Sequence, residues 1–109
     1  MKSYQKLDLI NNYVEIYKCI FDCKQAIIHS SEESTIKKLS EFYNELINLK
    51  TIYEKTFIEK NIMDDSLILL KMQLDSALNN PPNLSKKEYS LEKLISKKKH
   101  LESALQNIN

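Results

Sequence analysis

The hydrophobic and polar positions of this chain alternate with the period of an α-helix. Apolar residues recur at steps of three and four positions, which places them on one side of a helix. Three polar breaks interrupt this spacing, at residues 29–33, 61–65 and 79–83. The pattern therefore predicts an all-α fold whose helices cover about residues 3–28, 31–61, 65–78 and 85–107. We expect one helical domain over residues 1–109, built as an elongated antiparallel bundle of three to four helices.

The first predicted helix has an unusually wide apolar side. Its apolar arc covers about 200°, whereas an ordinary surface helix needs about 100°. The arc is formed by Leu9, Ile10, Tyr13, Val14, Ile16, Tyr17, Ile20, Phe21, Cys23, Ile27 and Ile28. Such a width indicates that this helix contacts more than one neighbour, either in its own chain or in a partner.

The second predicted helix begins with a capping signal and has a charged outer side. Ser30 and Glu33 form a capping box, which ties the first turn of a helix to its own side chains. Oppositely charged pairs four residues apart support the exposed side: Lys37/Glu41, Lys50/Glu54 and Lys55/Glu59. The following break contains no proline. Its Asp64 can cap a new helix, and the alternative is a single helix that runs straight through.

The third predicted helix has the spacing of a coiled-coil seam. The seam follows steps of four and three residues along Met63, Leu67, Leu70, Leu74 and Ala77. Ile68, Leu69 and Met72 lie off this seam. This helix is therefore also broadly apolar.

Strong local signals mark the start of the fourth predicted helix. The tandem proline at 81–82 ends the preceding helix, because the residue before a proline is pushed out of helical geometry. Ser85 and Glu88 form a second capping box, and Leu84 and Tyr89 occupy the positions of a hydrophobic staple. These signals therefore predict that the last two helices form a C-terminal antiparallel helical hairpin with a stiff connector.

The composition removes several classes of function. The chain contains no glycine, so it has no Gly-rich phosphate loop, dinucleotide fingerprint or nucleophile elbow. Its hydrophobic fraction of 42% is too high for a disordered chain. All 16 basic residues are lysine and the formal net charge is +1, which gives no electrostatic basis for binding nucleic acid.

The residues able to carry out chemistry are few. Cys19 and Cys23 are best interpreted as small buried hydrophobes, with a regulatory thiol or zinc ligation as the alternatives. His29 and His100 have no third catalytic partner nearby in the sequence. We therefore expect no enzymatic activity, no metal and no cofactor.

One basic run stands out near the end of the chain. We interpret residues 97–100 as a solvated helix face in which the stem of Lys98 lies along the apolar seam. The alternatives are a docking site for an acidic partner and a patch that binds nucleic acid or lipid.

No segment predicts a signal peptide or a membrane span. Asp8 and Glu15 interrupt the N-terminal apolar region, and the longest aliphatic run, Leu67 to Leu70, is far too short to cross a bilayer. Two cysteines four residues apart do not provide a disulfide framework. We therefore expect a cytoplasmic protein.

The C-terminal segments resemble a known family. Residues 86–108, KKEYSLEKLISKKKHLESALQNI, are similar to the second helix of the small helical-hairpin co-chaperones of type III secretion, through the Lys86/Tyr89 start and the run Leu101 to Ala104. Residues 69–80, LLKMQLDSALNN, match the first helix of that hairpin. These co-chaperones are shorter, and residues 1–60 have no counterpart in them. The resemblance implies a non-catalytic protein that holds an amphipathic secreted helix soluble before export.

Together these features favour a protein-binding module of the export-chaperone type. Its partner is expected to be an amphipathic helix of another protein, a second copy of the chain, or both. The residues expected to contact it are the off-seam apolar ones: Leu9, Ile16, Cys19, Ile68, Leu69 and Met72. The alternative is an immunity- or inhibitor-type protein that blocks a toxin or an enzyme by surface contact, and a nucleic-acid-binding regulator is less favoured.

Overall fold

The structure is a computed structural model that describes residues 3–79 and 90–107. It contains four α-helices: α1 (Ser3–His29), α2 (Glu33–Glu59), α3 (Asp65–Asn79) and α4 (Leu91–Gln106). The described residues form no strand, which confirms the all-α fold. The molecule is elongated, with extents of 45 × 27 × 18 Å.

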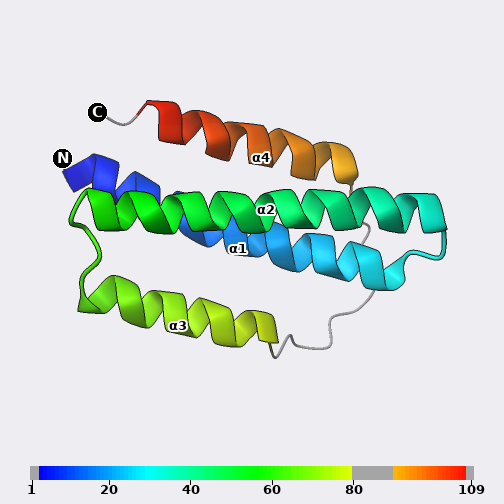
Figure 1. Ribbon diagram of the computed structural model, residues 1–109, viewed down its shortest axis with the longest axis horizontal. Coiled ribbons are helices and arrows are strands. Elements are labelled where there is room, and N and C mark those ends of the chain that lie inside the picture. The colour runs from blue at the N-terminus through cyan, green and yellow to red at the C-terminus, as the bar shows by residue number, and fades with distance from the viewer. Residues whose placement is uncertain (1–2, 80–89, 108–109) are drawn as a thin grey trace.

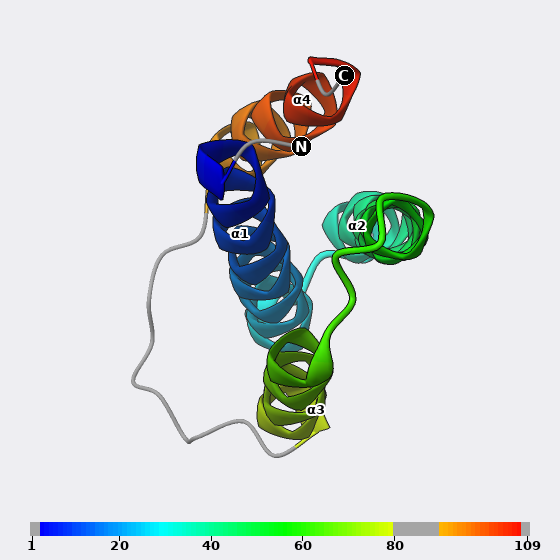
Figure 2. The same cartoon turned by 90° about the vertical axis from the view of Figure 1, so that its left-hand side faces the viewer.

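Helix α1 occupies the centre of the arrangement. It packs along α2, which runs beside it in the opposite direction (Figure 1). Helices α3 and α4 pack against α1 from two different sides, and α4 also contacts α2 (Figure 2). Three neighbours on one helix account for the wide apolar arc of α1 within a single chain.

The predicted C-terminal hairpin is not confirmed. Helices α3 and α4 lie on opposite sides of α1 and do not pack against each other (Figure 2). Each covers a different part of the apolar arc of α1, so neither needs the other for burial. The predicted capping box at Ser85 and the staple of Leu84 and Tyr89 lie outside the described residues.

The hydrophobic core consists largely of side chains from α1 and α2. The buried apolar residues of α1 are Leu9, Tyr13, Ile16, Tyr17, Cys19, Ile20 and Cys23. They meet Leu39, Phe42, Leu46, Leu49, Tyr53 and Phe57 of α2. In contrast, α3 adds Leu67, and α4 adds Leu94 and Leu101, as fully buried residues. The α1–α2 pair therefore forms the stable body onto which the two shorter helices are attached.

Helix α2 begins later than the sequence indicates. Its N-cap is Glu32, in an extended conformation, and the backbone N–H of Ser30 instead bonds to the carbonyl of Ile27 at the end of α1. The Thr35 hydroxyl donates to the Glu32 carboxylate at 2.9 Å. The predicted capping box of Ser30 and Glu33 is therefore wrong, because Ser30 still belongs to the turn that closes α1.

The break between α2 and α3 is built without glycine. Asn61 takes the left-handed conformation, with φ of 55°. The N–H of Ile62 bonds to the carbonyl of Phe57 at 2.9 Å, and the N–H of Asn61 to that of Ile58 at 3.1 Å. This is the Schellman pattern, in which asparagine replaces the usual glycine. Asp64 then caps α3 by accepting from the N–H of Leu67 at 2.9 Å.

Candidate interaction surfaces

The outer face of α3 carries the clearest exposed apolar surface. Ile68, Leu69 and Met72 are 44%, 55% and 63% exposed. Their spacing of one and three residues places them on one side of the helix. The opposite side packs inward through residues that are wholly or partly buried: Leu67, Leu70, Leu74 and Leu78. Helix α3 is therefore apolar on both sides, and its own chain covers one of them.

The sequence prediction of partner-binding residues divides into two groups in the structure. Ile68, Leu69 and Met72 lie together on the exposed face of α3. Leu9, Ile16 and Cys19 are buried in the core of α1, so the structure does not place them on a surface that a partner can reach. The sequence left open whether the excess width of the α1 arc contacts a partner or other helices of the same chain, and in the structure α2, α3 and α4 pack against it.

Two buried tyrosines of α1 link the three helices from beneath α3. The Tyr13 hydroxyl donates to Glu54 Oε2 of α2 at 2.6 Å, and the Tyr17 hydroxyl donates to Asp75 Oδ1 of α3 at 2.5 Å. The two hydroxyl oxygens approach to 3.3 Å. Each hydroxyl has one proton and gives it to a carboxylate. The bonds to the carboxylates are therefore the ones that connect the helices.

Two lysines complete this cluster and balance its charge. Lys71 of α3 lies 2.9 Å from Asp75 Oδ2 and 3.6 Å from Glu54 Oε2. Lys50 of α2 lies 3.2 Å from Glu54 Oε2 and 3.9 Å from Asp75 Oδ1. The side chains of Lys50 and Glu54 are only 16% and 17% exposed. The prediction that this pair supports a solvent-facing side of the second helix is therefore wrong, because α3 covers it.

We call Tyr13, Tyr17, Lys50, Glu54, Lys71 and Asp75 the polar seat of α3. Sequence analysis did not identify it. The available signal was the repeated four-residue spacing of its members, between 13 and 17, 50 and 54, and 71 and 75, because such spacing aligns them on single helix faces.

The protonation states of Tyr13, Tyr17, Lys71 and Asp75 are fixed near neutral pH. Burial, followed by the hydrogen bonds to the carboxylates, raises the pKa of Tyr13 and of Tyr17 above its ordinary value. Burial acts to raise the pKa of Asp75, but the bonds from Tyr17 and Lys71 outweigh it and lower that pKa. The bond to Asp75 raises the pKa of Lys71. The tyrosines thus remain donors and the aspartate remains charged, which is the behaviour of a fixed structural contact.

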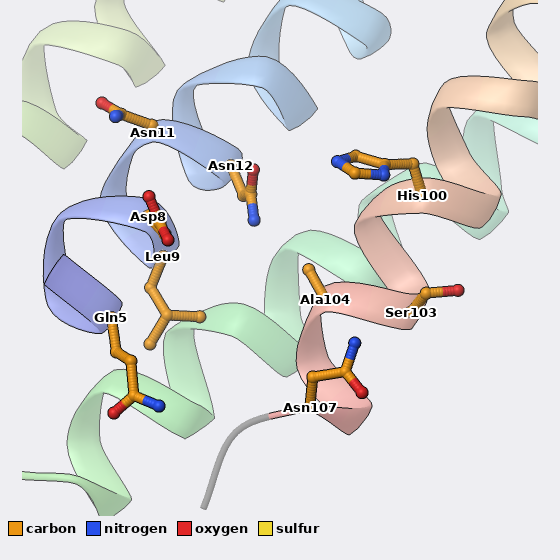
Figure 3. A pocket seen from close by; sticks show the side chains of 9 residues that line it. All are labelled: Gln5, Asp8, Leu9, Asn11, Asn12, His100, Ser103, Ala104 and Asn107. Carbon is orange, nitrogen blue, oxygen red and sulfur yellow. The ribbon is translucent and has the colours of Figure 1, made fainter. Parts of the chain in front are cut away.

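A polar cleft follows the seam between α1 and α4. It has a volume of about 510 Å³, and Figure 3 shows its two walls. Leu9 and Ala104 line it together with polar residues of both helices: Gln5, Asp8, Asn11, Asn12, His100, Ser103 and Asn107. The ring of His100 extends from α4 toward Asn12 on α1 (Figure 3). The cleft is a polar seam between two helices, and its chemistry differs from that of the α3 face.

The basic run at 97–100 does not act as a uniform patch. Lys98 is only 19% exposed and forms ion pairs with Glu102 at 2.8 Å and Glu45 at 3.6 Å. Its ammonium also lies 5.9 Å from the centre of the Phe42 ring. Lys97, Lys99 and His100 remain exposed, and of these three residues His100 lines the cleft. The position of Lys98 along the seam agrees with the snorkelling expected from the sequence.

The two cysteines are core residues. Cys19 and Cys23 are fully buried, and the Cys23 thiol donates to the carbonyl of Leu39 at 3.3 Å. Burial raises the pKa of each thiol to about 11. Among residues 3–79 and 90–107, no cluster of three or more histidine, cysteine or acidic side chains could hold a metal ion. Within the same ranges, no helix has the length and hydropathy that a transmembrane helix needs.

Comparison of the chain with protein-family models, with curated proteins and with solved structures finds no match.

Proposed function

We propose that this protein is a non-catalytic binding module that holds an amphipathic helix of another protein against the outer face of α3. The observation that carries the proposal is the exposed row of Ile68, Leu69 and Met72. Anchors that project from one side of a helix at such spacing are typical of helix-to-helix recognition. In this proposal α1, α2 and α4 are the scaffold of the bundle, and α3 presents the binding face.

The polar seat explains how such a face can be presented without a partner. An apolar helix that is loosely attached would rotate to bury its outer residues. The bond from Tyr17 of α1 to Asp75 and the ion pair of Lys71 with Glu54 of α2 fix the rotation of α3 about its own axis. A binding face that is held in position loses less conformational entropy when a partner binds.

The biological role that fits this face best is that of a small export chaperone of the cytoplasm. The resemblance of residues 69–80 and 86–108 to type III secretion co-chaperones supports this role, and two of the three exposed apolar residues of α3, Leu69 and Met72, fall within the first of these segments. A secreted helical subunit needs its apolar side covered before export. A short apolar row on a stable scaffold supplies such a cover.

Comparative capture from the native host tests the proposal. The bait proteins are the wild type, the variant Leu69→Lys/Met72→Lys, and the control Ile28→Lys. Ile28 is 62% exposed and lies at the far end of α1, so its change alters an exposed apolar residue away from α3. We expect a small helical protein to be captured by the wild type and the control but lost with the α3 variant. Equal capture by all three proteins would refute the proposal.

An inhibitor or immunity role is a second candidate, and a separate observation favours it. Lys97, Lys99 and His100 are exposed on α4, and Lys97 and His100 line its seam with α1, where they could contact an acidic surface of a toxin or enzyme. This role predicts a partner that is lost from Lys97→Glu/Lys99→Glu and retained by the α3 variant. The two functions thus give opposite results in one set of captures.

A further inference from the structure

Helices α3 and α4 are attached to the rest of the bundle by different kinds of contact. Leu67 is the one fully buried residue that α3 supplies within the described part of the chain. Helix α4 supplies Leu94 and Leu101, and the buried hydroxyl of Tyr53 donates to the carbonyl of Leu101 at 2.7 Å. Among the described residues, the backbone of α3 lies close to that of α1 alone, whereas α4 packs against both α1 and α2. Buried, uncharged contacts therefore hold α4 more firmly than they hold α3.

Charged groups fasten α3 at two places along its length. The first is Asp64, which accepts from the N–H of Leu67 at 2.9 Å and pairs with Lys6 of α1 at 3.4 Å. The second is Asp75 in the polar seat, about 16 Å further along the helix at a rise of 1.5 Å per residue. The two points of attachment thus lie toward opposite ends of α3, and each depends on one aspartate.

The contacts of the polar seat depend on the negative charge of Asp75. This carboxylate accepts from the Tyr17 hydroxyl of α1 at 2.5 Å, pairs with Lys71 of α3 at 2.9 Å and faces Lys50 of α2 at 3.9 Å. Lys71 and Lys50 also both reach Glu54 of α2, at 3.6 Å and 3.2 Å. If Asp75 becomes neutral, two ammonium groups share the one carboxylate that remains. The seat then has an excess positive charge, which repels α3 from α2.

We propose that α3 is a detachable helix: neutralising Asp64 and Asp75 releases it from α1 as one unit, while α1, α2 and α4 stay assembled. Protonation in acid neutralises both side chains. Release uncovers the side of α1 that carries Tyr17, together with the inner leucine row of α3. The inference concerns the attachment of α3, so it stands whether or not a partner helix binds the outer face.

Acid acts on both points of attachment in the same direction. The N–H of Leu67, followed by Lys6, lowers the pKa of Asp64. In Asp75, burial acts to raise the pKa, but the hydrogen bonds to the carboxylate outweigh it and lower that pKa. Both contacts therefore stabilise the attachment of α3 above the unfolded-state pKa of about 4, and both are lost as the pH falls through the lower folded-state values.

A released α3 should lose its own helical structure. It has 15 residues, and an isolated helix of this length is marginal in water. Its backbone amides then exchange together as a local unit. Helix α4 does not share this sensitivity to charge. Its Lys98 pairs with Glu45 and Glu102, whose side chains are 58% and 46% exposed, and ion pairs with such exposed groups contribute little.

Hydrogen exchange measured by mass spectrometry tests the inference at neutral pH. The variant is Asp64→Ala/Asp75→Asn, which removes both charges and the cap of α3. The matched control is Glu45→Gln/Glu102→Gln, which removes two carboxylates that pair with Lys98 of α4. In the variant we expect exchange to accelerate at least ~10-fold along the whole of α3, including its last turns, and to stay within about twofold of the wild type in α2 and α4. The control should leave α3 as protected as in the wild type.

The wild type in acid provides a second test without any substitution. As the pH falls from about 5 to about 3, the protection of α3, corrected for the intrinsic exchange rate, should be lost before that of α4. Equal loss in both helices at the same pH would contradict the inference. Three results with the variant would also overturn it: an α3 that stays protected, faster exchange confined to the first turn that Asp64 caps, and faster exchange over all four helices. Complete unfolding of the variant belongs to the last of these, and circular dichroism detects it.

Discussion

Removing one hydroxyl should loosen α3 while leaving the rest of the bundle in place. The change is Tyr17→Phe, which keeps the buried ring and removes the donor that bonds to Asp75 at 2.5 Å. Tyr17 is buried, so no water can substitute for the hydroxyl from the α1 side. The Tyr13 hydroxyl still donates to Glu54, so the variant leaves no buried donor unsatisfied.

The expected cost follows from what remains around Asp75. A hydrogen bond to a charged group contributes about 1.5–3 kcal/mol. The Asp75 side chain is 38% exposed and keeps its ion pair with Lys71 at 2.9 Å, so water and lysine compensate part of the loss. We therefore expect the low end of the range, about 1.5 kcal/mol. For a chain of this length this lowers the melting temperature by roughly 5–8 °C.

Two measurements check the magnitude and the location of the effect. Urea unfolding gives the change in the free energy of unfolding. The slope of this free energy against urea concentration should stay unchanged if the folded and unfolded states keep their compactness. Hydrogen exchange should accelerate in α3 and not in α4, because α3 opens as a local unit. Tyr43→Phe is the matched control, since the Tyr43 hydroxyl forms no hydrogen bond within the described part of the chain. Wild-type stability of Tyr17→Phe, or uniform acceleration over all helices, would refute the view that the polar seat holds α3.

Four further predictions concern other parts of the chain. Tyr53→Phe removes a buried 2.7 Å bond to the carbonyl of Leu101, so it should cost about 1 kcal/mol in urea unfolding and accelerate hydrogen exchange in α4 instead. Asn61→Ala should lower the free energy of unfolding by about 1 kcal/mol in the same assay, because position 61 has a left-handed φ of 55° and alanine lacks the short polar side chain that lets asparagine adopt it. Asn61→Gly should not destabilise the protein, because glycine has no Cβ. Asp64 and Asp75 have folded-state pKa values below their ordinary ones. Their contribution to the free energy of unfolding is therefore complete above the unfolded-state pKa of about 4 and is lost as the pH falls through the lower folded-state pKa. The urea concentration at the midpoint of unfolding should decrease over this acid range, and Asp75→Asn should make that decrease smaller. Finally, iodoacetamide should leave both cysteines unmodified in the native protein at neutral pH, since burial raises their pKa to about 11, and mass spectrometry should detect two adducts only after unfolding.

Helical periodicity was sufficient to predict the fold class and the approximate positions of the helices. The spacing of three and four residues predicts which residues share a helix side, and the buried residues of α1 and α2 follow it closely. Periodicity carries no information about which helix covers a given side. The wide arc of α1 was therefore compatible with a partner or with several helices of the same chain. The structure shows the second case, which places Leu9, Ile16 and Cys19 in the core.

Charge pairs show a second limit of sequence reasoning. Lys37/Glu41 and Lys50/Glu54 have the same spacing on the same helix. Lys37 and Glu41 are exposed as expected, but Lys50 and Glu54 lie beneath α3. The Lys50/Glu54 pair differs because four residues that are distant in the sequence surround it: Tyr13, Tyr17, Lys71 and Asp75. Local spacing cannot predict such a contact before the packing of the helices is known.

The same physical facts explain why α3 exposes three apolar residues together on one face. A helix of this length that sits on a wholly apolar surface could rotate about its axis with little change in contact area, and the more hydrophobic side would turn inward. The polar seat prevents this, because any rotation would separate Asp75 and Lys71 from their partners on α1 and α2. Breaking a partly buried charge network costs more than covering part of three side chains would gain. The exposed row of Ile68, Leu69 and Met72 is therefore a consequence of the buried charges beneath it, and a variant that neutralises the seat should reduce partner binding without altering any exposed residue.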